Sequence, residues 1–204
     1  MVNSLNSIGA NYGSGSSQQV VTSINEKKSE DSLWIIKDAQ RASKRCRAGD
    51  AIKCGDKIRL EHNETGKNLH SHRQFKAPIS GRQEVSGFGN DGRGDAGDDW
   101  QIVCNENRNY GQPRGEGDQV HGSDFFHLKH VDTGCMLVTD SNSRFNNSNC
   151  PRCPILGQLE VACEQNKLQK STLWRMDSGF FFPLREEEEE DATKNGDSWG
   201  TDEL

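Results

Sequence analysis

The chain has 204 residues, enough for one domain with a buried core followed by a tail. Residues 185–204 hold nine acidic and two basic side chains, so this end is strongly negative and the rest of the chain is nearly neutral. A neutral body argues against nucleic acid or an anionic membrane as a partner, and no apolar run is long enough to span a bilayer.

The first predicted strands lie before residue 40. The segment GSSQQVVT at 15–22 is typical of a strand after a flexible connection, and SLWII at 32–36 forms a second strand around Trp34. LNSI at 5–8 precedes both strands.

The next segment repeats this pattern and adds a hairpin. LEHNETGKNL at 60–69 predicts two strands joined by a polar turn, in which Gly66 gives the backbone the freedom that the turn needs. SGRQEVSGF at 80–88 and DWQIV at 99–103 predict two more strands.

A third copy follows at a constant offset of 68 residues. LKHVDTGCML at 128–137 matches the hairpin at 60–69, and LGQLEVAC at 156–163 and TLWRM at 172–176 match the later strands. Three such units cannot each bury a face alone, and closing them around a threefold axis removes exposed sheet edges. We therefore predict an all-β fold, a β-trefoil, with Trp34, Trp100 and Trp174 in its core.

These segments resemble a known family. LHSH at 69–72, SGRQEVS at 80–86 and DDW at 98–100 resemble the MIR motif, and their arrangement resembles the stromal cell-derived factor 2 family. The resemblance implies a domain over 1–184 with MIR repeats at about 1–40, 52–105 and 120–184, the first one incomplete, and a disordered acidic tail over 185–204. The motif residues are Leu69, His70, Ser71, His72, Gly81, Glu84, Val85 and Trp100.

The same resemblance implies a role in the lumen of the endoplasmic reticulum. The family suggests a noncatalytic protein that needs no cofactor and works with a luminal Hsp40 co-chaperone, the luminal Hsp70 and misfolded clients. A glycan-binding module linked to protein O-mannosylation is the alternative. No Ser/His/Asp arrangement or carboxylate pair can be assigned by spacing, so we name no catalytic residue.

Three histidines lie close together at His62, His70 and His72. On a strand His70 and His72 point the same way, which is how some zinc sites begin. The pair is not repeated in the other units and has no visible third ligand, so we expect no metal site. His62 recurs as His130 in the matching hairpin.

The two ends of the chain differ in what they indicate about entry into the endoplasmic reticulum. Thr201, Asp202, Glu203 and Leu204 form TDEL, a close variant of the tetrapeptides that return proteins to the endoplasmic reticulum. The first residues show no signal peptide, and the first unit lacks the hairpin that corresponds to 56–68. We infer an N-terminally shortened sequence, whose predicted strand at 180–184 would lack a partner, and expect an extended version to melt at a higher temperature.

Seven cysteines favour an oxidising compartment, and their odd number leaves at least one unpaired. Because the first and fourth strands of a trefoil unit are antiparallel, Cys54 and Cys104 are candidates for a disulfide, with Cys46 as the competing partner of Cys54. Cys135 and Cys163 form a second candidate pair. CPRC, with Cys150 and Cys153, is either a redox dithiol or a loop disulfide in an insertion of the third unit.

Two sequons, at Asn63 and Asn146, fall in predicted turns. A glycan on either asparagine would project into solvent.

Overall fold

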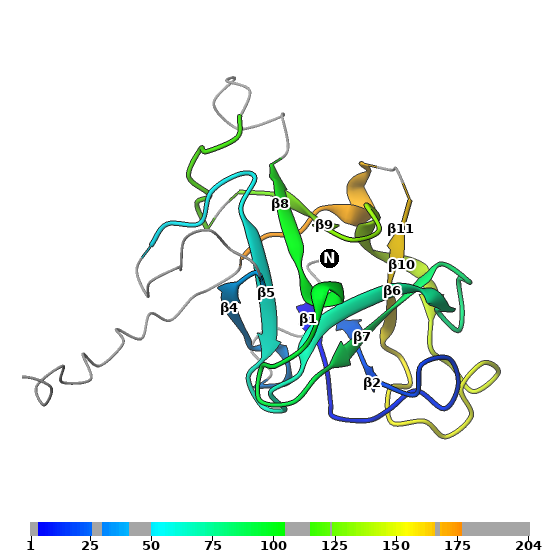
Figure 1. Cartoon of the computed structure of the whole chain (residues 1–204). Helices are drawn as coiled ribbons and strands as arrows, with labels where there is room; N and C mark the ends of the chain where they lie inside the picture. Colours follow the sequence, from blue (N-terminus) through cyan, green and yellow to red (C-terminus); the bar gives the residue numbers. More distant parts are fainter. Residues whose placement is uncertain are drawn as a thin grey trace, which may run out of the picture.

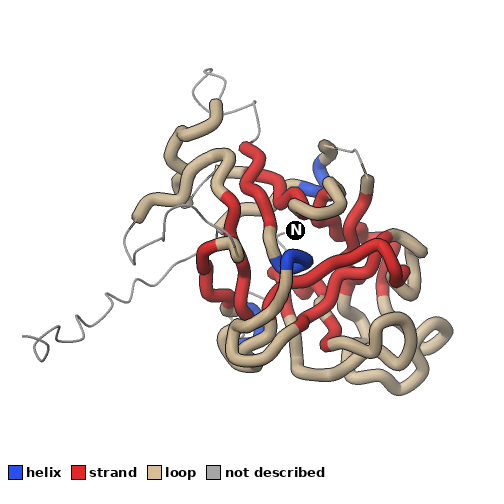
Figure 2. The backbone as a smooth tube through the Cα atoms, viewed as in Figure 1, coloured by secondary structure: helices blue, strands red, loops and turns tan. Residues whose placement is uncertain are grey.

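The computed structural model describes residues 4–25, 30–40, 50–104, 115–122, 124–165 and 168–176. These ranges contain eleven strands and three short 3-10 helices in one body (Figures 1 and 2). In chain order the elements are β1 Ser4–Asn6, β2 Gln19–Val20, β3 Thr22–Ile24, η1 Glu30–Ser32, β4 Trp34–Asp38, β5 Lys57–His62, β6 Asn68–Lys76, β7 Gln83–Phe88, η2 Ala96–Asp98, β8 Trp100–Cys104, β9 Phe126–His130, β10 Met136–Arg144, β11 Leu159–Glu164 and η3 Lys170–Thr172.

The strands form a barrel wall closed at one end by hairpins. The wall is antiparallel: β4 pairs with β5, β5 with β8, and β8 with β9. An isolated bridge joins Phe126 of β9 to Trp174. The pairs β6–β7 and β10–β11 cross the end of this wall, where β7 also pairs with β2 and β11, and β11 with β3. Figure 1 shows β5 and β8 side by side, with β6 and β7 running across below them.

The hairpin end repeats around a threefold axis. Val21 directly follows β2, Val85 lies in β7 and Val161 lies in β11. All three side chains are completely buried. The pairing advances by one unit each time, because Val20 lies opposite Ser86, Glu84 opposite Ala162, and Glu160 opposite Thr22. The predicted all-β trefoil is confirmed.

The tryptophans obey the same symmetry. A 3-10 helix ends two residues before each of them. Each indole donates a hydrogen bond to a leucine carbonyl, from Trp34 to Leu5 at 3.1 Å, from Trp100 to Leu69 at 2.8 Å and from Trp174 to Leu137 at 3.0 Å. The hydrogen bonds therefore place residues 5–8, 69–72 and 137–140 at equivalent positions of the three units.

The two His-x-x-Thr-Gly hairpins also coincide. In both turns the glycine N–H donates to the carbonyl of the histidine, Gly66 to His62 and Gly134 to His130. The His62 ring packs on Trp34 and the His130 ring on Trp100, with centroids 4.9 Å apart in each case. These histidines hold one unit against the tryptophan strand of the unit before it.

Two predictions concern the C-terminal part of the chain. The predicted strand at 180–184 and the acidic tail at 185–204 lie outside the described residues. Among the residues that are described, no helix has the length and apolar character needed to cross a membrane.

Candidate functional site

The MIR motif residues come from β6, the turn after it, β7 and the start of β8. Leu69, Val85 and Trp100 are completely buried and belong to the main core cluster. The Ser71 hydroxyl donates to the carbonyl of Glu84 at 2.6 Å, which joins β6 to β7. Gly81 has a φ of 67°, a conformation that glycine adopts without strain. These motif residues build the fold.

His70 lies in a buried polar cluster with the 3-10 helix η2. Its Nδ1 is 2.9 Å from Oδ1 of Asp98, whose second oxygen accepts hydrogen bonds from the Asp95 backbone N–H at 2.9 Å and the Asn68 amide at 3.2 Å. Asp95 in turn caps the helix by accepting from the Gly97 N–H. The cluster fixes η2, and hence Trp100, against β6.

Arg59 of β5 extends the cluster to the barrel wall. Its Nε donates to Asp99 at 2.8 Å, and its guanidinium is 3.8 Å from Asp98. Gly97 packs so closely on the His70 ring that an added Cβ would overlap it. The tight fit explains why a glycine occupies the middle of η2.

The cluster contains side chains that could in principle bind a metal together with His70. The ligand atoms of His70, Asp95 and Asp98 lie within 4.8 Å of one another, so the structure gives His70 two potential co-ligands that the sequence pattern does not predict. Asp98 precedes Trp100 in the DDW segment, but its contact with His70 spans 28 residues and no local pattern reveals it. Because protein donors already occupy both Asp98 oxygens, hydrogen bonds account for the cluster without an ion.

His72 does not join this cluster. Its ring lies 5.1 Å from that of His70, on the same face of β6 as expected for a period of two. Its buried Nδ1 has no hydrogen-bond partner among the described residues. Burial, and secondarily the neighbouring His70, lower the pKa of His72, so the ring is neutral at neutral pH.

Three disulfides join the six described cysteines. Cys54, just before β5, bonds to Cys104 at the end of β8, and Cys135 bonds to Cys163, in each case with 5.4 Å between the Cα atoms. Cys150 bonds to Cys153 within the insertion of the third unit. These are the pairs that the sequence analysis named as candidates, and Cys46 lies outside the described residues. Disulfides are typical of proteins of the secretory pathway.

The comparisons with known proteins agree with this architecture. The family model of the MIR domain matches residues 8–182. The crystal structure of the SDF2-like protein from Arabidopsis thaliana has a TM-score of 0.71 at 34% identity, covering 89% of this chain and 90% of that one. The chain belongs to the stromal cell-derived factor 2 family. The resemblance drawn from its motifs is therefore confirmed.

Other relatives define how far the likeness extends. Human stromal cell-derived factor 2 is 48% identical over 101 residues, which are 50% of this chain and 46% of the human protein. The chain thus matches about half the length of that relative. A protein O-mannosyltransferase complex of S. cerevisiae, solved with its sugar donor, has a TM-score of 0.66 at 29% identity, and the match covers 84% of this chain and 22% of that one.

Within this MIR domain the CPRC segment lies in a loop. Cys150 and Cys153 are half-buried and pack beside the small core cluster of Tyr12 and Phe145. Turns follow Cys153 until β11, so the described residues give the pair no helix N-terminus that would lower a thiol pKa. The geometry favours the loop disulfide over a redox dithiol.

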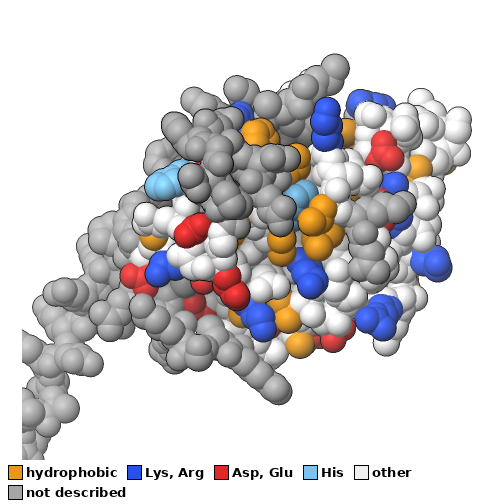
Figure 3. Space-filling view, turned by 90° about the horizontal axis from the view of Figure 1, so that it is seen from above, with side chains coloured by type: hydrophobic (Ala, Val, Ile, Leu, Met, Phe, Trp, Pro, Cys, Tyr) orange, Lys and Arg blue, Asp and Glu red, His pale blue; other side chains and the backbone are white. Residues whose placement is uncertain are grey.

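Both sequon asparagines are exposed. Asn146 forms a turn in which its side-chain oxygen accepts from the Ser148 N–H at 2.8 Å, while Asn63 lies in the turn after β5. The retrieval signal at 201–204 lies outside the described residues. Figure 3 shows acidic and basic side chains interspersed on the upper face, with no single-sign patch among those described.

Proposed function

We propose that this stromal cell-derived factor 2 relative is a noncatalytic protein of the endoplasmic reticulum lumen. There it joins an Hsp40/Hsp70 chaperone complex and helps to keep misfolded clients from aggregating. Membership of the family is the observation that carries the proposal. Three disulfides support an oxidising compartment, and TDEL at 201–204 resembles retrieval tetrapeptides.

The packing of the motif supports a binding role over a catalytic one. Its buried residues make core contacts and backbone hydrogen bonds, while many of the exposed residues lie in loops that connect the strands. Such loops are where binding residues concentrate in many folds.

A pull-down from luminal extract tests the proposal. The tagged chain should recover an Hsp40 co-chaperone and Hsp70, identified by mass spectrometry, while an unrelated tagged disulfide-bonded β protein should recover neither. Equal recovery of both chaperones by the two baits would contradict the proposal.

A glycan-binding module linked to protein O-mannosylation is the alternative, favoured by the likeness to the yeast mannosyltransferase complex. Two carboxylates recur between units, Glu84 and Glu160, but the third equivalent residue is Val20 and both acids accept hydrogen bonds from neighbouring loops. A glycan array discriminates, because saturable binding of a mannose-containing glycan would favour the alternative.

A further inference from the structure

The threefold symmetry of the hairpin end is broken at one position. Val20, Glu84 and Glu160 each immediately precede one of the three fully buried valines, so they are equivalent residues of the three units. Two of the three are acids, and the third is apolar.

Each glutamate holds the hairpin loop of the preceding unit. Glu84 accepts hydrogen bonds from the N–H and hydroxyl of Ser16, in the loop of the first unit. Glu160 accepts from the N–H groups of Ile79 at 2.6 Å and Ser80 at 3.0 Å, in the loop of the second unit. By the same rotation Val20 faces the loop of the third unit, to which it can offer no hydrogen bond.

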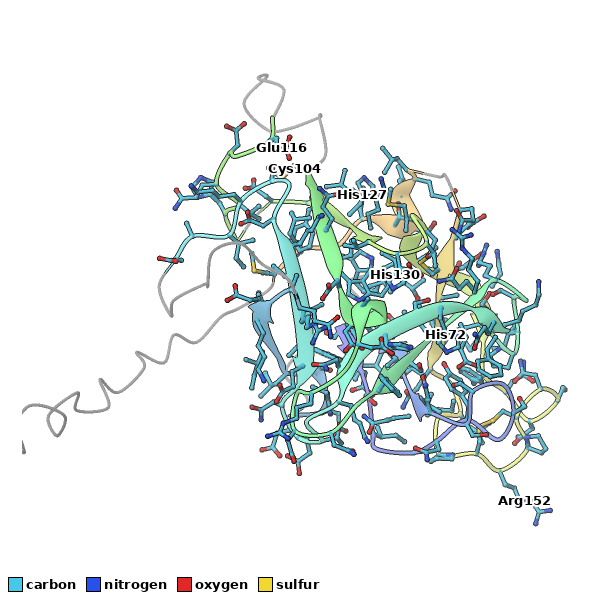
Figure 4. All side chains as sticks on the ribbon, in the orientation of Figure 1. His72, Cys104, Glu116, His127, His130 and Arg152 are labelled. Carbon is cyan, nitrogen blue, oxygen red and sulfur yellow. A yellow bond between two sulfur atoms is a disulfide. The ribbon has the colours of Figure 1, made fainter. Side chains whose placement is uncertain are left out.

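A cavity of about 380 Å³ lies at this third position. Its floor is the small core cluster of Tyr12, Val20, Phe145 and Ile155, all buried. The Cys150–Cys153 disulfide and the neighbouring prolines form a wall on the side of the inserted loop. In Figure 1 this loop, in yellow, lies beside the blue loop of the first unit, and Figure 4 shows Arg152 pointing away into solvent.

The lining determines what kind of ligand fits. None of its residues carries a charge, so a charged group would lose part of its hydration there and find no opposite charge. The volume lies within the range of small-ligand sites and exceeds what one aromatic ring needs. The exposed amide of Asn11 at the rim can hydrogen-bond a peptide backbone.

We propose that this cavity binds an uncharged apolar side chain, such as phenylalanine or leucine, of an extended polypeptide. The inference rests on the proposed role in handling misfolded clients and names the surface that contacts them. The inserted loop and its disulfide give the third unit a binding wall where the other two units have a glutamate clamp.

Fluorescence anisotropy with labelled ten-residue Gly/Ser peptides tests this binding directly, using the whole chain. A peptide with one central Phe or Leu should bind saturably, and the matched peptide with Asp should bind at least about tenfold more weakly, because its charged side chain gains no apolar burial. Equal binding of the Phe and Asp peptides would overturn the proposal.

Two variants locate the site. Val20→Glu gives the first unit the residue of the other two, and Ala10→Phe fills the cavity from its half-exposed edge. Both should abolish binding of the Phe peptide, whereas Val131→Asp, which removes an exposed apolar side chain outside the cavity, should leave it unchanged. Thermal melting of each variant shows which of them is folded, and a folded Ala10→Phe that still binds would place the site elsewhere.

The outcomes separate this inference from the proposed function. Recovery of Hsp40 and Hsp70 without Phe-peptide binding would overturn the cavity assignment alone, and peptide binding without chaperone recovery would overturn the complex alone. Displacement of the Phe peptide by methyl α-mannoside would overturn the peptide assignment in favour of a sugar site.

Discussion

The indole hydrogen bonds show how single residues fix this fold. Trp100 is completely buried and donates to the Leu69 carbonyl, while Trp174 makes the equivalent bond to Leu137 from a half-buried position. A large aromatic side chain supplies apolar burial, and its N–H satisfies a carbonyl at the end of a core strand. The same residue type therefore joins two elements in every unit.

Trp100→Phe should lower the free energy of unfolding by about 2–4 kcal/mol, because it leaves a buried carbonyl unpaired and removes core volume. Urea denaturation measures the loss. Trp174→Phe is the matched control and should cost less, since water can reach its half-buried surroundings. An equal loss in both variants would show that burial does not determine the effect.

His130 links stability to pH. Its Nε2 donates to the Gly97 carbonyl at 2.8 Å, and its Nδ1 accepts from the Thr133 N–H at 3.3 Å, so the neutral ring satisfies both nitrogens. Burial lowers the pKa of His130, against opposing contributions from the Gly97 bond and Asp132. The unfolded chain therefore takes up this proton first, at about pH 6.5, and stability is lost as the pH falls below that value.

We expect the melting temperature to fall as the pH is lowered from about 6.5 to 5.5, with His130 contributing up to about 1.4 kcal/mol per pH unit. His130→Gln should make this slope shallower. His121→Gln, at an exposed position, is the control and should keep the slope of the parent protein. A slope that is unchanged in His130→Gln would contradict the assignment.

At the scale of elements, short 3-10 helices orient the tryptophan strands, and their third residue makes the decisive contact. Asp98 bonds to His70, Ser32 to Asn6, and Thr172 to His127. The sequence predicts the strands from hydrophobic and aromatic patterns but not these helices. They are only three residues long, and their partners lie on other strands.

The three disulfides should contribute unequally. The Cys54–Cys104 bond spans 50 residues and the Cys150–Cys153 bond only 3, so loop-closure entropy predicts about 4 and about 2 kcal/mol respectively. Replacing each pair by alanine and measuring urea denaturation checks this order. If replacing Cys150 and Cys153 lowered the free energy of unfolding more than replacing Cys54 and Cys104, the inserted loop would stabilise parts of the fold beyond its own segment.

At the scale of the whole molecule, the three units share a core but differ at the surface. The buried valines and indole bonds repeat around the axis, while the glutamate clamp is present twice and replaced once by a cavity. Repetition stabilises the framework because each unit buries the faces of its neighbours. We place peptide binding at the cavity, where the repetition is broken.

The sequence by itself determined the strand pattern, the threefold repeat and the family, because hydrophobic alternation and turn glycines are local properties that recur at fixed offsets. The candidate pair of Cys54 and Cys104 also follows from the order of strands in a trefoil unit. Only the tertiary structure decided that His70 bonds to Asp98, and that Val20 and the inserted loop line a cavity. Those contacts join residues from different strands and units, and their distances depend on how the closed barrel brings the units together.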